Sequence, residues 1–97
     1  MKNINEIIDS IKSVKPILYS DCSIKEIGVF GSYSRNEQNE NSDIDILIDI
    51  EKEIGLLRFI QIENYLKNIV GDNAEVVLKS DLRPELKEQI LKETIFI

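Results

Sequence analysis

The sequence contains no histidine and a single cysteine, Cys22. Without histidine, general base catalysis by an imidazole and zinc sites built on histidine are both excluded. One cysteine excludes an internal disulfide and a cysteine metal cluster, and it is typical of the reducing cytoplasm, which is the location we expect. Any bound metal should therefore be a hard cation held by carboxylates, with magnesium or manganese preferred over zinc.

Long apolar segments are also missing. No run approaches the roughly 20 apolar residues that a membrane-spanning helix requires, and the N-terminus does not resemble a secretion signal. The formal net charge of −6 argues against direct binding to a nucleic-acid backbone. An acidic protein can still hold a nucleotide when a divalent cation supplies the positive charge.

The residues that are present predict a small domain that contains a sheet. A length of 97 residues is typical of one domain, 1–97, and hydrophobic residues make up 42% of it. Aromatic residues are few, so isoleucine, leucine and valine must build the core, and the β-branched residues among them favour strands. The spacing of apolar residues predicts an α/β (α+β) fold in which helices pack on a small mixed β-sheet.

The same spacing predicts the order of elements. Asn3 or Asn5 should cap a first helix, which we expect to stop or kink near Val14 because Pro16 lacks an N–H, with a second short helix at 17–19. Strands are expected at 25–30, 43–50 and 74–78, helices at about 55–70 and 84–93, and a fourth strand or an open edge at 95–97. The inward sides of the last two helices should include Leu56, Leu57, Ile60 and Leu86.

Two aspartates at the start of the second strand are the first candidate site residues. Asp43 and Asp45 lie on one face of that strand, roughly 6–7 Å apart along it. Carboxylates at this spacing can converge on one or two divalent cations, and without a cation their charges repel each other. Asp49 shares the face but lies roughly 13 Å from Asp45, so we interpret it as a solvated strand end outside the site.

A glycine-serine turn between the first two strands is the second candidate feature. Gly31 lets the backbone approach a phosphate closely, and Ser32 offers a hydroxyl and an N–H. If residues 32–36 begin a helix, its free N–H groups add an anion site, and Arg35 can make a forked contact to a phosphate oxygen. Each feature alone is more often an ordinary turn or surface residue. Their combination indicates a site for a metal and a nucleotide.

These residues also resemble a known family. Gly31-Ser32, ten intervening residues and Asp43-Ile44-Asp45 resemble the signature of the DNA polymerase β-like nucleotidyltransferases. The surrounding segments 30–35 and 42–48 sharpen the resemblance to the minimal nucleotidyltransferases, which consist of roughly one domain. The resemblance implies a polymerase β-like nucleotidyltransferase core and a magnesium-dependent transfer of a nucleotidyl group, usually AMP from ATP, to a hydroxyl.

The resemblance also implies roles for individual residues. Ser32 would hold the terminal phosphates of the nucleotide, while Asp43 and Asp45 would bind two Mg²⁺ or Mn²⁺ ions. Glu75, on the third strand, would be the third metal ligand and would help to deprotonate the acceptor, at a position where the family commonly has aspartate. Asn36 stands where the family often has glycine, and asparagine tolerates the left-handed backbone better than most residues.

Minimal nucleotidyltransferases of this kind are similar to antitoxins that pair with an all-helical HEPN-domain toxin. The resemblance therefore implies a hetero-oligomer in which this chain silences the toxin by adding AMP to a tyrosine. Two alternatives stay open. One is a transferase that modifies a small molecule such as an aminoglycoside, and the other is an antitoxin without catalytic activity that blocks its toxin by contact alone.

Overall fold

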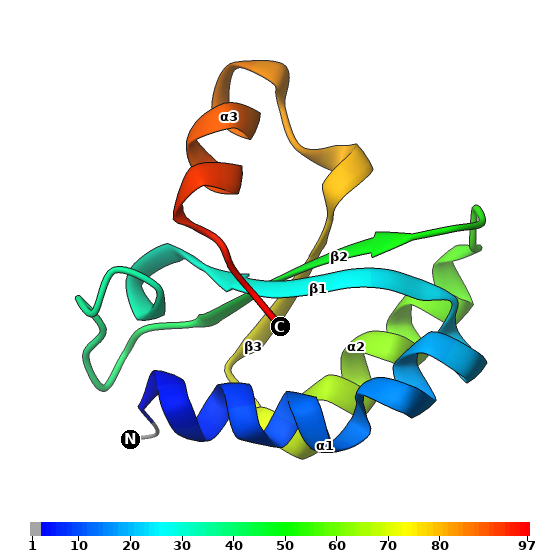
Figure 1. Ribbon diagram of the computed structural model, residues 1–97, viewed down its shortest axis with the longest axis horizontal. Coiled ribbons are helices and arrows are strands. Elements are labelled where there is room, and N and C mark those ends of the chain that lie inside the picture. Colours follow the sequence, from blue (N-terminus) through cyan, green and yellow to red (C-terminus); the bar gives the residue numbers. More distant parts are fainter. Residues whose placement is uncertain (1–2) are drawn as a thin grey trace.

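The computed structural model describes residues 3–97 as three α-helices and a four-stranded sheet, joined by turns (Figure 1). Two short 3₁₀ helices, η1 and η2, follow strands β1 and β3. The elements in chain order are α1 (Ile4–Cys22), β1 (Ile24–Phe30), η1 (Gly31–Tyr33), β2 (Ile44–Ile50), α2 (Leu56–Val70), β3 (Ala74–Leu78), η2 (Lys79–Asp81), α3 (Pro84–Glu93) and β4 (Ile95–Phe96). The predicted mixed α/β fold is confirmed, and the last apolar segment forms a fourth strand.

The sheet has the strand order β3-β2-β1-β4. Strand β1 is antiparallel to both β2 and β4, whereas β2 and β3 are parallel and are joined by the crossover helix α2. Helices α1 and α2 cover one face of the sheet, and α3 lies over the other face (Figure 1). This arrangement leaves β3 and β4 as the two edges of the sheet.

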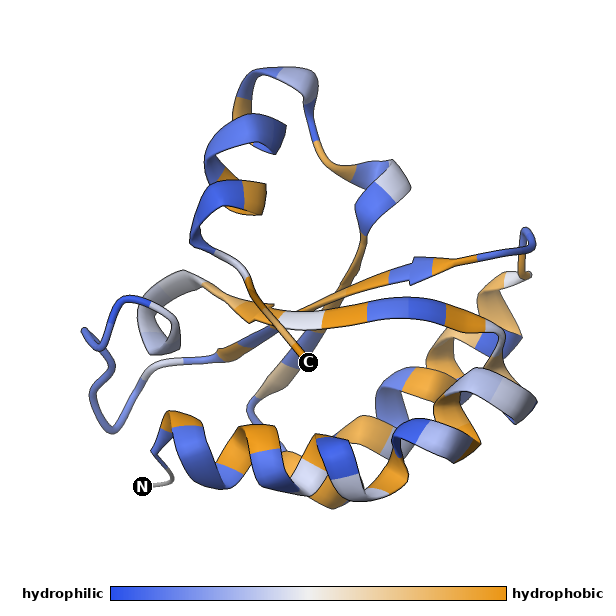
Figure 2. Ribbon diagram, viewed as in Figure 1, coloured by the Kyte–Doolittle hydropathy of each residue, from blue (hydrophilic) through white to orange (hydrophobic). Residues whose placement is uncertain are grey.

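The hydrophobic core lies between the sheet and helices α1 and α2, which turn their apolar sides toward the strands (Figure 2). Alternation along β2 explains the strand's contribution, because every second side chain points to the same face. Ile44, Ile46 and Ile48 point into the core and are at most 1% exposed. The intervening residues, which include Asp45 and Asp49, therefore face the side on which α3 lies.

Helix α1 continues through Pro16, so the predicted stop near Val14 and the separate short helix at 17–19 are wrong. Asn3 caps the helix, and its side chain accepts a hydrogen bond from the N–H of Glu6. Beyond the proline, Leu18 and Cys22 extend the buried side of the helix. A proline inside a helix costs about 3 kcal/mol, and burial of one leucine side chain recovers about 1.5–3 kcal/mol.

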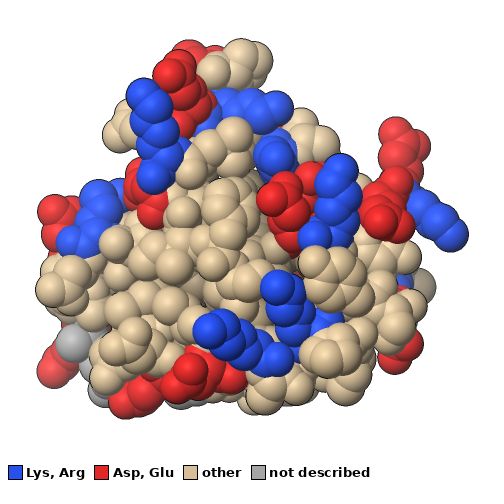
Figure 3. Space-filling model, in the orientation of Figure 1, with Lys and Arg blue, Asp and Glu red and all other residues tan. Residues whose placement is uncertain are grey.

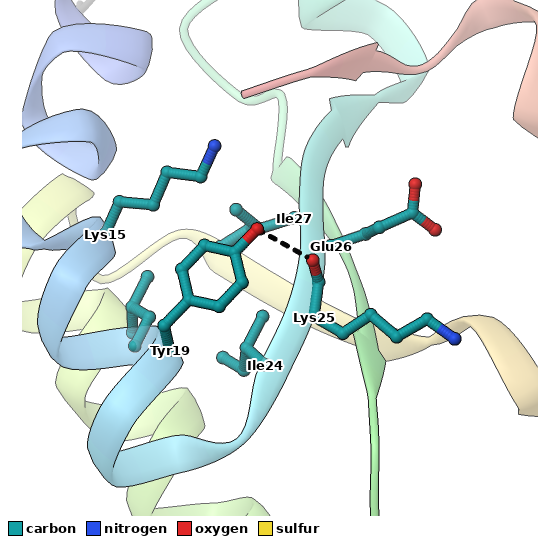
Figure 4. Close-up of a pocket in the computed structure, with 7 residues that line it drawn as sticks. Lys15, Tyr19, Ile24, Lys25, Glu26 and Ile27 are labelled. Atoms are coloured by element: carbon teal, nitrogen blue, oxygen red, sulfur yellow. Dashed lines mark hydrogen bonds between the residues drawn. The ribbon is translucent and has the colours of Figure 1, made fainter.

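A tyrosine on the far side of the proline also ties α1 to the sheet. The hydroxyl of Tyr19 donates to the carbonyl oxygen of Lys25 at 3.0 Å, and the Lys15 ammonium lies 5.7 Å from the centre of the Tyr19 ring (Figure 4). The ring, together with Ile24 and Ile27, lines a shallow hollow between α1 and β1. These tertiary contacts, together with the burial of Leu18, explain why the local preference for a break does not decide the structure.

Replacement of Pro16 by alanine should stabilise the protein. The side chain is exposed, so little packing is lost, and the carbonyl of residue 12 regains a helical hydrogen bond. We expect the free energy of unfolding to rise by about 1–3 kcal/mol, measured by denaturant titration. Lys12→Ala, at an exposed position of the same helix, should change it by less than about 0.5 kcal/mol. A destabilised Pro16→Ala variant would show that the proline is needed for the packing of α1.

The predicted inward sides of α2 and α3 need correction. Leu56, Leu57 and Ile60 are exposed by 76%, 72% and 40%, and the buried residues of α2 are Ile62, Leu66 and Val70. At 3.6 residues per turn, Leu57 and Ile60 fall on the side of the helix opposite Ile62. In α3, Leu86 is 46% exposed.

Within residues 3–97, no helix is both long enough and apolar enough to span a bilayer.

Candidate active site

The turn after β1 places a glycine directly against an aspartate of the neighbouring strand. Gly31 has a φ of +74°, a left-handed conformation that side chains disfavour. A Cβ atom built on Gly31 would overlap Oδ2 of Asp45. A side chain at this position would therefore strain the backbone and push the Asp45 carboxylate aside.

Residues 32–36 do not begin an α-helix, which was the condition for the additional anion site. The place of this helix is taken by the 3₁₀ helix η1 and a turn, in which the N–H groups of Ser34 and Arg35 both donate to the carbonyl oxygen of Gly31. These two N–H groups are consequently not free to bind an anion. Asn36 closes the turn with a φ of +57°, which confirms that it adopts the left-handed conformation.

The three predicted carboxylates gather at one end of β2 and β3. Asp45 is paired with Glu75 in the register of these two parallel strands, and Asp43 immediately precedes β2. Burial raises the pKa of Asp45 to about 6, and the negative charges of Glu75 and Asp43 add to the effect. Glu93 raises this pKa further, while Arg35 acts in the opposite direction. The structure thus concentrates negative charge at Asp45.

The donor types in this cluster suit a hard divalent cation. Carboxylate oxygens are the ligands that magnesium and manganese prefer. Burial is the main cause of the raised pKa of Asp45, and a cation would neutralise the charge repulsion that adds to it. Within residues 3–97, no three potential ligand side chains already converge as a ready-made metal site. Asp43 and Glu75 are both exposed, so they have the freedom to turn toward a cation beside Asp45.

Ser32 and Arg35 lie in the same turn but differ in their surroundings. Ser32 is half-buried, and its hydroxyl has no hydrogen-bond partner within the described residues 3–97. The guanidinium of Arg35 makes two ion pairs, at 2.8 Å to Glu37 and at 2.6 Å to Glu93. Arg35 is therefore already neutralised by carboxylates of the same chain.

Glu93 is the residue at this site that the sequence did not indicate. It is the last residue of α3, and its Oε2 accepts hydrogen bonds from the Gly31 N–H at 2.9 Å and from Arg35 Nη1 at 2.6 Å. Its partners lie about sixty residues earlier in the chain, so no local pattern could place it here. The only available signal was its charge, which is shared with 17 other acidic residues (18 Asp and Glu in all).

Asp49 lies outside the carboxylate cluster but is not solvated as predicted. Its side chain is 22% exposed and pairs with Lys25 at 3.6 Å and with Lys79 at 3.8 Å. Lys79 also pairs with Glu26 at 3.3 Å, so the charges at this end of β2 are balanced. Asp45 differs from Asp49, because its neighbours include three acidic side chains, Asp43, Glu75 and Glu93.

Comparison with known proteins gives close relatives over the whole described chain. Residues 4–97 match the nucleotidyltransferase domain family. MJ1217 of Methanocaldococcus jannaschii, named as a candidate protein adenylyltransferase, is 41% identical over 98 residues, which cover 100% of both chains. The protein adenylyltransferase MntA of Thermococcus cleftensis is 38% identical over 97 residues, or 100% of this chain and 98% of MntA.

Solved structures agree with this relationship. A structure described as a candidate minimal nucleotidyltransferase superposes with a TM-score of 0.82 at 28% identity, over 97% of this chain and 95% of that chain. A tri-AMPylated Shewanella oneidensis HEPN toxin in complex with MNT antitoxin contains a chain with a TM-score of 0.65 at 18% identity, over 94% of this chain and 70% of that chain, which shows a shared fold. This chain therefore belongs to the nucleotidyltransferase domain family, among its minimal members.

Proposed function

We propose that this chain is a magnesium-dependent protein adenylyltransferase that transfers AMP from ATP to a hydroxyl of a HEPN-type toxin, a tyrosine in the simplest case, and thereby acts as its antitoxin. The observation that carries the proposal is the position of Asp45, which lies against the Gly31 turn and beside Glu75. This arrangement supports the proposal, because the turn that would bind phosphates lies beside the carboxylates that would bind a cation.

Each candidate residue has a distinct role in the proposed reaction. The Ser32 hydroxyl and the turn hold the terminal phosphates, while Asp43, Asp45 and Glu75 hold magnesium. Bound magnesium supplies positive charge that neutralises the phosphates. The acceptor oxygen attacks the α-phosphorus, the bond from this phosphorus to the oxygen that bridges to the β-phosphate breaks, and pyrophosphate leaves. Glu75 takes the hydroxyl proton, since histidine is absent from the sequence.

The surroundings of the site favour a protein as the acceptor. Glu75 is exposed on β3, an edge strand of the sheet, where a large partner can reach it. Lys and Arg side chains on the face shown in Figure 3 are interspersed with Asp and Glu, a pattern that does not suit a nucleic-acid backbone. The relative MntA is named a protein adenylyltransferase, and the structural neighbour contains an AMPylated toxin.

The test measures which labelled phosphate of ATP is transferred to the acceptor protein. The purified chain is incubated with magnesium and a HEPN partner, with ATP labelled either at the α-phosphate or at the γ-phosphate. We expect the α-label on the partner and the γ-label in released pyrophosphate. Transfer of the γ-label would contradict the proposal, as would labelling of an aminoglycoside in place of the protein. Neutralisation of the toxin without any labelling would favour an antitoxin that acts by contact.

A further inference from the structure

The carboxylate of Glu93 occupies a set of donors that suits a phosphate oxygen. Its Oε2 lies 2.9 Å from the Gly31 nitrogen, 2.6 Å from Arg35 Nη1 and 3.4 Å from Ser34 Oγ. A backbone N–H in a tight turn, a hydroxyl and a guanidinium are the groups that proteins use to bind phosphates. The side chain is only 17% exposed, so the anion is held within the turn.

The negative charge of Glu93 makes the turn electrostatically unfavourable for a phosphate. Asp45 already senses the negative charge of Glu93 together with those of Glu75 and Asp43. A triphosphate cannot use Gly31 and Arg35 while Glu93 remains on them, because both anions would compete for the same donors.

The helix that carries Glu93 contributes no residue to the hydrophobic core of the described residues 3–97. Helix α3 contributes no buried side chain within the described residues, and Leu86 on it is 46% exposed. Ile90 and Leu91 of α3 are half-buried, whereas the buried Thr94 and strand β4, which pairs with β1, both follow Glu93 in the chain. Withdrawal of the Glu93 side chain from the turn therefore disturbs little of the hydrophobic core.

We propose that Glu93 is an internal competitor of the nucleotide, which keeps the phosphate-binding turn closed until a triphosphate displaces its carboxylate from Gly31 and Arg35. The inference rests on the proposed function, because it assumes that this turn binds the phosphates of ATP. It adds that nucleotide affinity in this chain is set partly by a carboxylate from the end of α3.

The test compares nucleotide binding by the wild-type chain and by Glu93→Gln. The glutamine keeps the size of the side chain and an acceptor for the Gly31 N–H, but it removes the charge. We expect Glu93→Gln to bind magnesium-ATP about tenfold more tightly, measured by calorimetric titration, which corresponds to about 1.4 kcal/mol. Adenosine, which has no phosphate, should bind both proteins equally, a result that a purely structural role would not produce.

Two further variants control this experiment. Glu88→Gln removes an exposed carboxylate of the same helix, paired only with Lys92 in the structure of residues 3–97, and should leave ATP affinity unchanged. Glu93→Asp draws the carboxylate back by one methylene and should also tighten ATP binding, so the test does not depend on the folding of one variant. Equal or weaker ATP binding by both Glu93 variants would contradict this inference alone. Absence of ATP binding by every protein, including wild type, would contradict the proposed function and this inference with it.

Discussion

Replacement of both Asp43 and Asp45 by asparagine is expected to lower the rate of AMP transfer by at least about 1000-fold, because the carboxylates that would hold magnesium are lost. The measurement is the rate of transfer from α-labelled ATP to the HEPN partner. Asp49→Asn is the matched control, since Asp49 lies on the same strand face but is paired with Lys25 and Lys79. Transfer by Asp49→Asn should stay within about twofold of wild type.

The same double variant should be more stable than wild type above neutral pH. The folded protein raises the pKa of Asp45 from 3.8 to about 6, so between these values the folded state holds more protons than the unfolded state. Stability is then lost as the pH rises through this window, and the full cost remains above pH 6. For a half-buried group, solvent screening reduces this cost to on the order of 1 kcal/mol, and asparagine removes it.

Further measurements on this double variant test the stability prediction and the assignment of the two aspartates to the site. Thermal unfolding at pH 4 and pH 8 should show the gain in stability mainly at pH 8, because at pH 4 the Asp45 carboxyl is still largely protonated in the folded protein and the cost is mostly absent. If the double variant transfers AMP at the wild-type rate, the assignment of Asp43 and Asp45 to the site is wrong. If it loses transfer but still neutralises the toxin in cells, the protein acts as an antitoxin by contact, and its catalytic activity is not what protects the cell.

Gly31→Ala should be the most damaging single substitution at the turn. The alanine would have to adopt a φ near +74° while its Cβ meets Oδ2 of Asp45. We expect a loss of about 2–3 kcal/mol in the free energy of unfolding, together with at least a 100-fold loss of AMP transfer as the turn and Asp45 move apart. Denaturant titration and the labelled-ATP assay measure the two effects.

Gly55→Ala is the matched control for this prediction. Gly55 has a φ of −75°, and a Cβ built there meets nothing within 4 Å. Its replacement should change the free energy of unfolding by less than about 1 kcal/mol and leave transfer unaffected. If Gly31→Ala behaves like Gly55→Ala in both assays, the close contact with Asp45 does not define the site.

Sequence patterns predicted most of the elements because those elements depend on local spacing. Strand β2 is an example, since alternation alone puts Ile44, Ile46 and Ile48 on one face and Asp45 on the other. Helix α3 was predicted over the same residues, Pro84–Glu93, from its proline at the first position and its apolar spacing. The prediction failed at Pro16, where the burial of Leu18 offsets a local preference that favours a break.

The sequence by itself determined that Gly31 and Ser32 form a turn, that Asp43 and Asp45 follow at the start of the next strand, and that histidine chemistry is absent. These features are local, because they depend on residue type and on spacing within one or two elements. The family resemblance proposed Glu75 as a third carboxylate, but only the tertiary structure decided that Glu75 and Glu93 lie beside this turn. The parallel pairing of β3 with β2 brings Glu75 beside Asp45, and the docking of α3 and β4 brings Glu93 onto Gly31. Such contacts depend on how separate elements pack, and the spacing of residues along one segment carries no information about that packing.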